Sequence, residues 1–122
     1  MSVTLNSSGL SMDEVVRVAR HSEKLEISQE ALEKMAATRS HIESLAAAET
    51  PVYGISTGFG ALANKHIAPE DRVQLQKSLI RSHAAGMGDS VEKEVVRALM
   101  LLRTKTLASG RTGVRPVVAQ TY

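Results

Sequence analysis

The sequence predicts a mainly α-helical fold that also contains a small two-stranded β element. Apolar residues recur at intervals of three and four positions along several segments, which is the period of an α-helix with one buried face. Serine, proline and glycine stand at the ends of these segments, where helices usually begin and end. Strand signals are confined to two short stretches, near Val3–Leu5 and Leu25–Ile27.

The first helix is predicted to begin after Ser11 and to run to about Arg20. Ser11 and Glu14 have the spacing of a capping box, in which each side chain accepts a hydrogen bond from the backbone N–H of the other residue. The stretch Leu25–Ile27 alternates apolar and polar residues like a brief strand, and we expect it to pair with Val3–Leu5.

A longer second helix is predicted to begin after Ser28, whose hydroxyl can cap it. It should end before Pro51, because the ring of a proline disfavours helical geometry at the preceding residue, here Thr50. The apolar residues that share one face of this helix are Leu32, Met35, Ile42 and Leu45.

A third helix is predicted to have Pro69 in its first turn, with Glu70 and Asp71 complementing its positive end, and to stop by Gly86. Its shared face carries Val73, Gln76, Leu79, Ile80 and His83. We expect a fourth helix to open at Glu92 and to close at Gly110, with Val95, Leu99, Leu102 and Thr106 along one side. Pro116 should then start a last helix.

Composition predicts a globular protein of the cytoplasm with no membrane partner. The chain has 122 residues, of which 43% are hydrophobic and 23% charged, as is usual for a soluble domain. It has no cysteine, no apolar run near the roughly 18 residues of a membrane span, and no signal-peptide pattern.

We expect a compact helical domain over about 1–110, and the start of a further helix, too short to be stable alone, over 111–122. The chain therefore reads as the N-terminal segment of a longer protein.

Charge does not predict a nucleic-acid partner, because the formal net charge is only +2. From Val95 onward, however, there are five basic residues and no acidic one: Arg97, Arg103, Lys105, Arg111 and Arg115. Their partners lie in another chain or in further sequence, or they form an anion-binding face. The second interpretation corresponds to a non-enzymatic helical interaction module with a basic C-terminal face. The lack of aromatic residues among them argues against nucleic acid as its ligand.

The stretch from Tyr53 to Gly60, which reads Tyr-Gly-Ile-Ser-Thr-Gly-Phe-Gly, is the most informative segment. It holds one of the two tyrosines in a loop with three glycines, which remove the bulk that would bury an aromatic ring. Such a loop predicts a phenol that is presented to a ligand. A free phenol has a pKa near 10, so a catalytic base of this kind needs cations or hydrogen-bond donors that favour the phenolate.

This stretch resembles the tyrosine loop of the aromatic amino-acid ammonia-lyases, whose helical fold belongs to the ammonia-lyase and fumarase-like superfamily. Two later segments match the same family in the same order. One runs from Leu75 to Gly86 and contains Ser-His-Ala-Ala-Gly, which is similar to the histidine-specific members. The other is Ser-Gly-Arg-Thr-Gly-Val-Arg-Pro, from Ser109 to Pro116. Arg111 departs from the histidine that is more common there.

The resemblance implies that Tyr53 is the catalytic base and that His83 binds the ring of an aromatic amino-acid substrate such as L-histidine. Gly54, Gly58 and Gly60 would shape the loop around the substrate. The family uses an internal electrophile, methylidene-imidazolone (MIO), and no external cofactor. It assembles as homotetramers whose active sites combine several chains, so this chain alone is expected to be inactive. A related tyrosine lyase or an aminomutase is the alternative that the resemblance leaves open.

Three patterns are interpreted as decoys. Ala108-Ser109-Gly110 has the composition of the MIO tripeptide, but it should be the end of a helix, and the real Ala/Cys-Ser-Gly tripeptide is expected beyond Tyr122. The run from Gly58 to Ala63 fits a dinucleotide fingerprint only formally, because no strand precedes it. The other histidines, His21, His41 and His66, are too widely spaced to predict a metal site.

Overall fold

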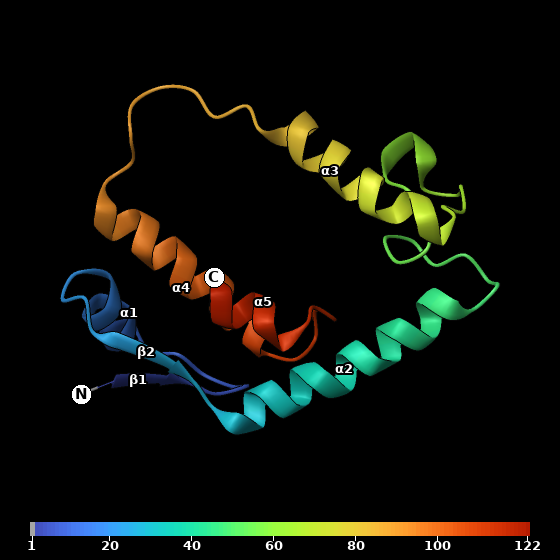
Figure 1. Ribbon diagram of the computed structural model, residues 1–122. Coiled ribbons are helices and arrows are strands. Elements are labelled where there is room, and N and C mark those ends of the chain that lie inside the picture. The colour runs from blue at the N-terminus through green and yellow to red at the C-terminus, as the bar shows by residue number, and fades with distance from the viewer. Residues whose placement is uncertain (1) are drawn as a thin grey trace. The chain divides into compact units, whose positions relative to one another are not determined.

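The structure, a computed structural model, describes residues 2–122 and divides them into two compact units. Unit 1 contains residues up to His41 together with Ser90–Tyr122, and unit 2 contains Ile42–Asp89. The fold is mainly helical, as predicted (Figure 1). Among the described residues, no helix combines the length and apolar character that a membrane span requires.

Unit 1 begins with strand β1 (Ser2–Leu5), helix α1 (Met12–Ala19) and strand β2 (Lys24–Ile27). The strands pair in parallel, with Val3 opposite Leu25 and Leu5 opposite Ile27, so the expected β element is confirmed. The capping box is also confirmed: Glu14 N–H donates to Ser11 Oγ at 3.3 Å, and Ser11 N–H donates to a Glu14 carboxylate oxygen at 2.7 Å.

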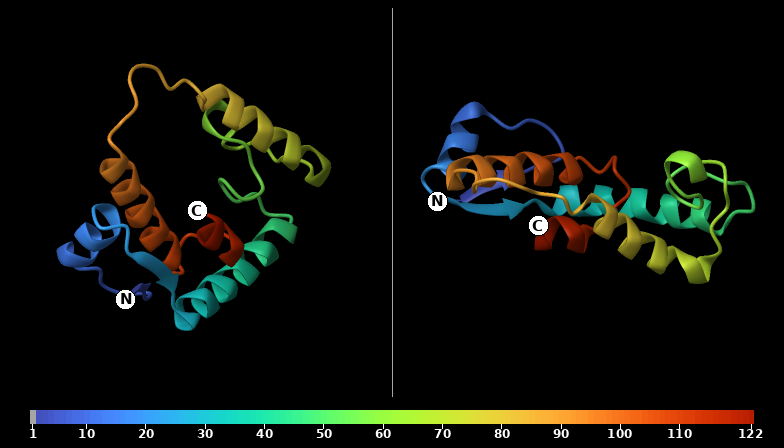
Figure 2. Two further views of the ribbon diagram at one scale, coloured as in Figure 1. Left: turned by 60° about the vertical axis from the view of Figure 1, so that its left-hand side comes forward. Right: turned by 90° about the horizontal axis from the view of Figure 1, so that it is seen from above.

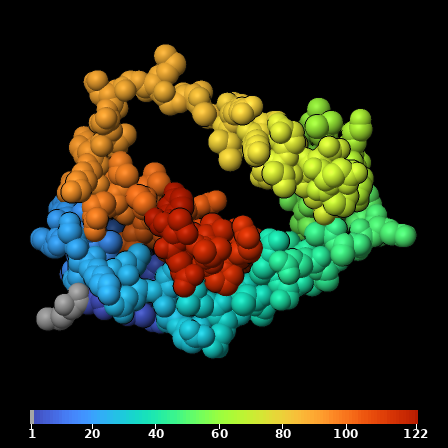
Figure 3. Space-filling view, in the orientation of Figure 1, coloured from blue at the N-terminus to red at the C-terminus, as the bar shows by residue number. Residues whose placement is uncertain are grey.

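Helix α2 (Gln29–Ala47) begins where predicted, with Ser28 Oγ accepting from the N–H of Ala31. Its buried residues are Ala31 and Met35, whereas the remaining members of the predicted face are only half-buried. Helix α4 (Lys93–Ala108) packs along α1, and the short helix α5 (Pro116–Thr121) lies against α4 (Figure 2). Figure 3 shows the C-terminal residues, in red, at the surface beside α4.

The buried face of α4 differs from the side that the sequence pattern indicates. Val95, Leu99 and Leu102 are 47%, 60% and 50% exposed. The core of unit 1 is instead built around Leu101 and Ala108 of α4, which pack with Val3, Leu5, Val18 and Ala31. Leu107 of α4 belongs to a second cluster with Met35 and Ala119. The apolar residues of α4 are distributed around the whole helix, so their spacing alone does not predict which face packs against α1.

Unit 2 consists of the end of α2 from Ile42 onward, the loop that follows, two 3₁₀ turns, η1 (Gly60–Leu62) and η2 (Pro69–Asp71), and helix α3 (Arg72–His83). Pro69 therefore opens a 3₁₀ turn that leads into α3. The helix ends at His83, three residues before Gly86, because Ala84 leaves helical geometry with φ −78° and ψ 73°. Arg72 links the start of α3 to the end of α2, because its guanidinium donates to the backbone carbonyls of Ile67 and Ala46 at 3.1 and 3.2 Å.

Candidate functional site

Tyr53 lies in the loop of unit 2 and is 64% exposed, as expected for a phenol held among glycines. Its ring contacts that of Phe59 edge to face, at a centroid distance of 6.2 Å and an interplanar angle of 78°. The phenol is thus accessible, while its ring is held on one side by an aromatic neighbour.

The loop requires glycine at three positions for two different structural reasons. Gly54 has φ +74° and Gly60 has φ +55°, backbone conformations that residues other than glycine rarely adopt. Gly58 instead allows a close approach, because a Cβ there would lie 2.5 Å from Cβ of Leu62. These conformations carry the chain sharply around Tyr53.

Two hydroxyl residues of the same loop, Ser56 and Thr57, are buried and were not identified as site residues from the sequence. Ser56 Oγ accepts from the N–H of Val52 at 3.0 Å. Thr57 Oγ1 accepts from the N–H of Gly54 at 3.3 Å and donates to the carbonyl of Gly58 at 3.1 Å. The missed signal was local: serine and threonine shortly after a turn residue often bond back to the backbone.

His83 is the last residue of α3 and is exposed. Its Nδ1 lies 2.9 Å from the carbonyl oxygen of Leu79 and 2.9 Å from Ser82 Oγ. Because a carbonyl only accepts, the first contact places a hydrogen on Nδ1. In the neutral imidazole Nε2 is then the acceptor of the ring, and it can receive a hydrogen bond from an N–H or O–H of a ligand.

Tyr53 and His83 belong to the same unit, but no bond links them within residues 2–122. The contact of Tyr53 is with Phe59, and the bonds of His83 stay within α3. Each is therefore positioned by its own local structure, the first by a loop and the second by a helix end.

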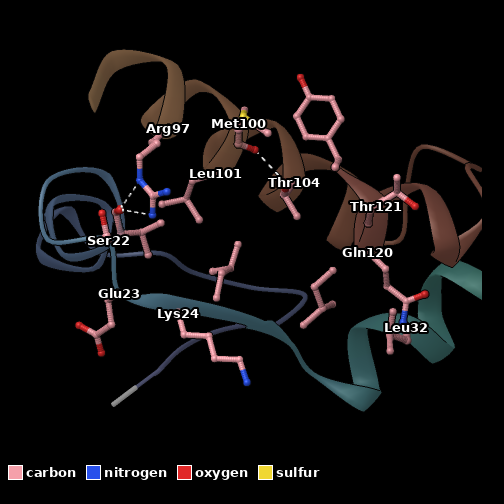
Figure 4. Close-up of a pocket in the computed structure, with 15 residues that line it drawn as sticks. Ser22, Glu23, Lys24, Leu32, Arg97, Met100, Leu101, Thr104, Gln120 and Thr121 are labelled. Carbon is pink, nitrogen blue, oxygen red and sulfur yellow. Dashed lines mark hydrogen bonds between the residues drawn. The ribbon is translucent and has the colours of Figure 1, made fainter. Parts of the chain in front are cut away.

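A cavity in unit 1 has a volume of about 640 Å³ and is lined by neither Tyr53 nor His83. It lies between β2, α4 and α5, and residues that line it include Lys24, Leu25, Leu101, Thr104 and Tyr122 (Figure 4). Arg97 also reaches it, but both Nε and Nη2 donate to the carbonyl of Val18, at 3.0 and 2.9 Å. Its guanidinium thus serves the fold, as does Lys105, which donates to the carbonyl of Asn6.

The segment Ala108-Ser109-Gly110 forms a helix end, as predicted. Ala108 is the last residue of α4 and is buried, Ser109 is the C-cap, and Gly110 follows with φ +70°. The nitrogen of Gly110, which would have to attack the carbonyl carbon of Ala108, donates to the carbonyl of Leu107 instead. The hydroxyl of Ser109 donates to the carbonyl of Thr106. These residues do not fit the formation of MIO.

Metal and dinucleotide sites receive no support from the described part of the chain. No group of three or more histidine, aspartate or glutamate side chains gathers within residues 2–122 in a way that could hold a metal ion. The glycines from Gly58 onward lead into a single 3₁₀ turn, η1, rather than joining a buried strand to a helix.

Comparison with known proteins gives consistent matches over nearly the whole chain. The family model described as aromatic amino acid lyase matches residues 10–122. The histidine ammonia-lyase of Streptomyces griseus is 60% identical over 119 residues, which are 98% of this chain and 23% of that protein. The chain thus spans about a quarter of the length of such relatives.

Solved structures are also similar to this chain over nearly its whole length. The histidine ammonia-lyase from Trypanosoma cruzi is 33% identical with a TM-score of 0.88, over 100% of this chain and 23% of that one. A tyrosine aminomutase from Streptomyces globisporus is 31% identical with a TM-score of 0.90, over 98% of this chain and 23% of that one.

Proposed function

Because the chain belongs to the aromatic amino acid lyase family, we propose that it is the N-terminal portion of a histidine ammonia-lyase. That enzyme eliminates ammonia from L-histidine and releases urocanate. The observation that carries the proposal is the 60% identity to a histidine ammonia-lyase over 98% of the chain, about twice the identity to the tyrosine aminomutase. The exposed Tyr53 and His83 supply the two functional groups that such a reaction needs from this segment.

Tyr53 acts as the base that removes a β-proton from the substrate. As phenolate, its oxygen takes the proton, the electrons of the C–H bond form the double bond between Cα and Cβ, and the C–N bond breaks to release ammonia. The exposure of the ring leaves room for the substrate side chain beside it. A positioned base of this kind contributes about 10²–10⁴ in rate.

His83 binds the substrate ring. In the neutral imidazole its Nε2 accepts a hydrogen bond from the substrate, while Nδ1–H donates to the carbonyl of Leu79. The imidazole of histidine offers such a donor, whereas the ring of phenylalanine does not. A site whose acceptor forms a hydrogen bond with the substrate binds an analogue without the donor much more weakly, because the acceptor is then left unpaired.

The remaining parts of the active site come from outside this segment. MIO would supply the electrophile that activates the substrate, and its Ala/Cys-Ser-Gly tripeptide is placed by this proposal beyond Tyr122. The enzyme works as a homotetramer in the cytoplasm, and the 122-residue chain is inactive by itself.

A tyrosine lyase or an aminomutase is the second candidate. The likeness to tyrosine aminomutase, with a TM-score of 0.90, favours it. The hydroxyl of tyrosine could also donate to Nε2 of His83. An interaction module with a basic face is less well supported, because Arg97 and Lys105 already bond backbone carbonyls.

Substrate preference in the parent enzyme tests the proposal. We expect kcat/KM for L-histidine to exceed that for L-tyrosine and L-phenylalanine by at least about 100-fold, followed as urocanate or the corresponding arylacrylate. Replacing the acceptor, in His83→Leu, should lower kcat/KM for histidine by about 10²-fold and change that for phenylalanine far less. A preference for tyrosine would instead establish the second candidate. Steady formation of urocanate by the 122-residue chain would contradict the placement of the electrophile.

A further inference from the structure

Two buried hydroxyl groups hold the backbone on both sides of Tyr53. The N–H of Val52, the residue before the tyrosine, donates to Ser56 Oγ at 3.0 Å. The N–H of Gly54, the residue after it, donates to Thr57 Oγ1 at 3.3 Å. Ser56 is 0% and Thr57 is 5% exposed, so these bonds are shielded from competition by water.

The two hydroxyl residues are themselves anchored to the far side of the loop. Thr57 forms an isolated antiparallel bridge with His66. The N–H of Ile67 donates to the carbonyl of Ser56 at 2.9 Å, and the N–H of Gly58 donates to the carbonyl of Lys65 at 3.2 Å. The hydroxyl pair therefore connects the segment around Tyr53 to a fixed part of unit 2.

Backbone bonds hold the peptide before Tyr53, because the carbonyl of Val52 accepts from the N–H groups of Ile55 and Ser56, both at 3.0 Å. The side chain of Tyr53 is mostly exposed and its ring contacts that of Phe59, and the following residue, Gly54, is a glycine at φ +74°. A glycine in this position leaves the backbone free to turn unless its N–H is held. The peptide that follows Tyr53 is held through the bond from Gly54 N–H to Thr57 Oγ1, and the Pro51–Val52 peptide is held through the bond from Val52 N–H to Ser56 Oγ, so these two bonds help to set the orientation of the phenol.

We propose that Ser56 and Thr57 are positioning residues for Tyr53, which act through the peptide groups of Val52 and Gly54. This inference rests on the proposed role of Tyr53 as the base. A shift of about 1 Å in a reacting group can cost about 10²-fold in rate, so loss of one hydroxyl should act on turnover more than on substrate binding.

Kinetics of Thr57 variants in the parent enzyme test the inference. Thr57→Val keeps the size of the side chain and removes the hydroxyl, and we expect kcat to fall about 10–100-fold with KM changed less than about threefold. Thr57→Ser keeps the hydroxyl and should recover most of the loss. The matched control is Thr106→Val on α4, an exposed threonine whose hydroxyl donates to the carbonyl of Leu102, and it should stay near wild type.

The Tyr53→Phe background separates positioning from a general effect on the fold. If Thr57 acts through the phenol, adding Thr57→Val to Tyr53→Phe should lower kcat by less than about a further threefold. An equal loss in both backgrounds would overturn the inference, as would a Thr57→Ser variant that is as slow as Thr57→Val.

Amide hydrogen exchange of the 122-residue chain, measured by NMR, gives a result that does not depend on activity. Thr57→Val should speed exchange at Gly54, and Ser56→Ala should speed it at Val52, by about tenfold or more, while Thr57→Ser should preserve protection. If Tyr53→Phe kept full turnover, the base role would fail, and exchange at Gly54 alone would decide the positioning role. Unchanged exchange in Thr57→Val would overturn it in every case.

Discussion

Replacing Gly110 with alanine should destabilise unit 1, because two separate costs meet at that position. Gly110 has φ +70°, which an alanine adopts only with strain. A Cβ there would also lie 2.8 Å from Cβ of Lys34 and 3.1 Å from its backbone carbonyl carbon, on helix α2. The backbone of a helix cannot move aside as the end of a flexible side chain can.

The expected loss can be worked out from these two terms. Left-handed geometry costs a residue with a Cβ about 1–2 kcal/mol. Overpacking against a fixed neighbour costs about 1–3 kcal/mol. Alanine also restricts the unfolded chain, which returns about 0.4–1 kcal/mol. The free energy of unfolding should therefore fall by about 3 kcal/mol, with limits of about 1 and 4.6 kcal/mol.

Denaturation by urea, followed by far-UV circular dichroism of the 122-residue chain, measures this change. The control is Gly9→Ala in the same unit, where φ is +30° and no atom lies within 4 Å of the added Cβ. That variant has the cost of a positive φ without the overpacking, so its free energy of unfolding should fall by about 0–1.6 kcal/mol, less than in Gly110→Ala. If Gly110→Ala were as stable as the control, Gly110 would not be the tightly packed helix end on which the exclusion of Ala108-Ser109-Gly110 as the electrophile depends.

Three further predictions concern unit 1, each measured by the same denaturation. Ser11→Ala removes the capping box of α1 and should cost about 1 kcal/mol. Leu101→Ala opens a cavity in the core and should cost about 2–5 kcal/mol, whereas Leu102→Ala, on the 50% exposed side of the same helix, should cost less than about 1 kcal/mol. The hydrogen bonds from Arg17 lower the pKa of the Glu23 carboxyl. This pair should stabilise the fold above the usual glutamate pKa and cease to do so as pH falls through the lowered one, and Glu23→Gln should flatten that acid-side decline.

Local signals predicted the ends of the elements well. The capping box of Ser11 and the cap of Ser28 need only neighbouring residues, so the sequence contains everything that forms them. The helix end at Gly110 was predicted for the same reason. The sequence also predicts that β1 pairs with β2, but it does not specify the parallel direction of that pairing.

Packing between distant segments was harder to predict. Leu101 is buried and Leu102 exposed because α1 meets α4 on one side, and neither residue differs from the other in its own chemistry. The hydrogen bonds of Ser56 and Thr57 were not predicted, because the prediction for this loop rests only on its tyrosine and glycines. Tyr53 and His83 are predicted as site residues from motifs, and both are exposed.

The kcat of Tyr53→Phe in the parent enzyme, with L-histidine as substrate, tests the proposed base most directly. The substitution keeps the ring and its contact with Phe59 and removes only the hydroxyl. Tyr122→Phe, at the other tyrosine of the segment, is the matched control and should keep normal turnover. We expect kcat of Tyr53→Phe to fall by at least about 100-fold. Turnover within a few-fold of wild type would contradict the account.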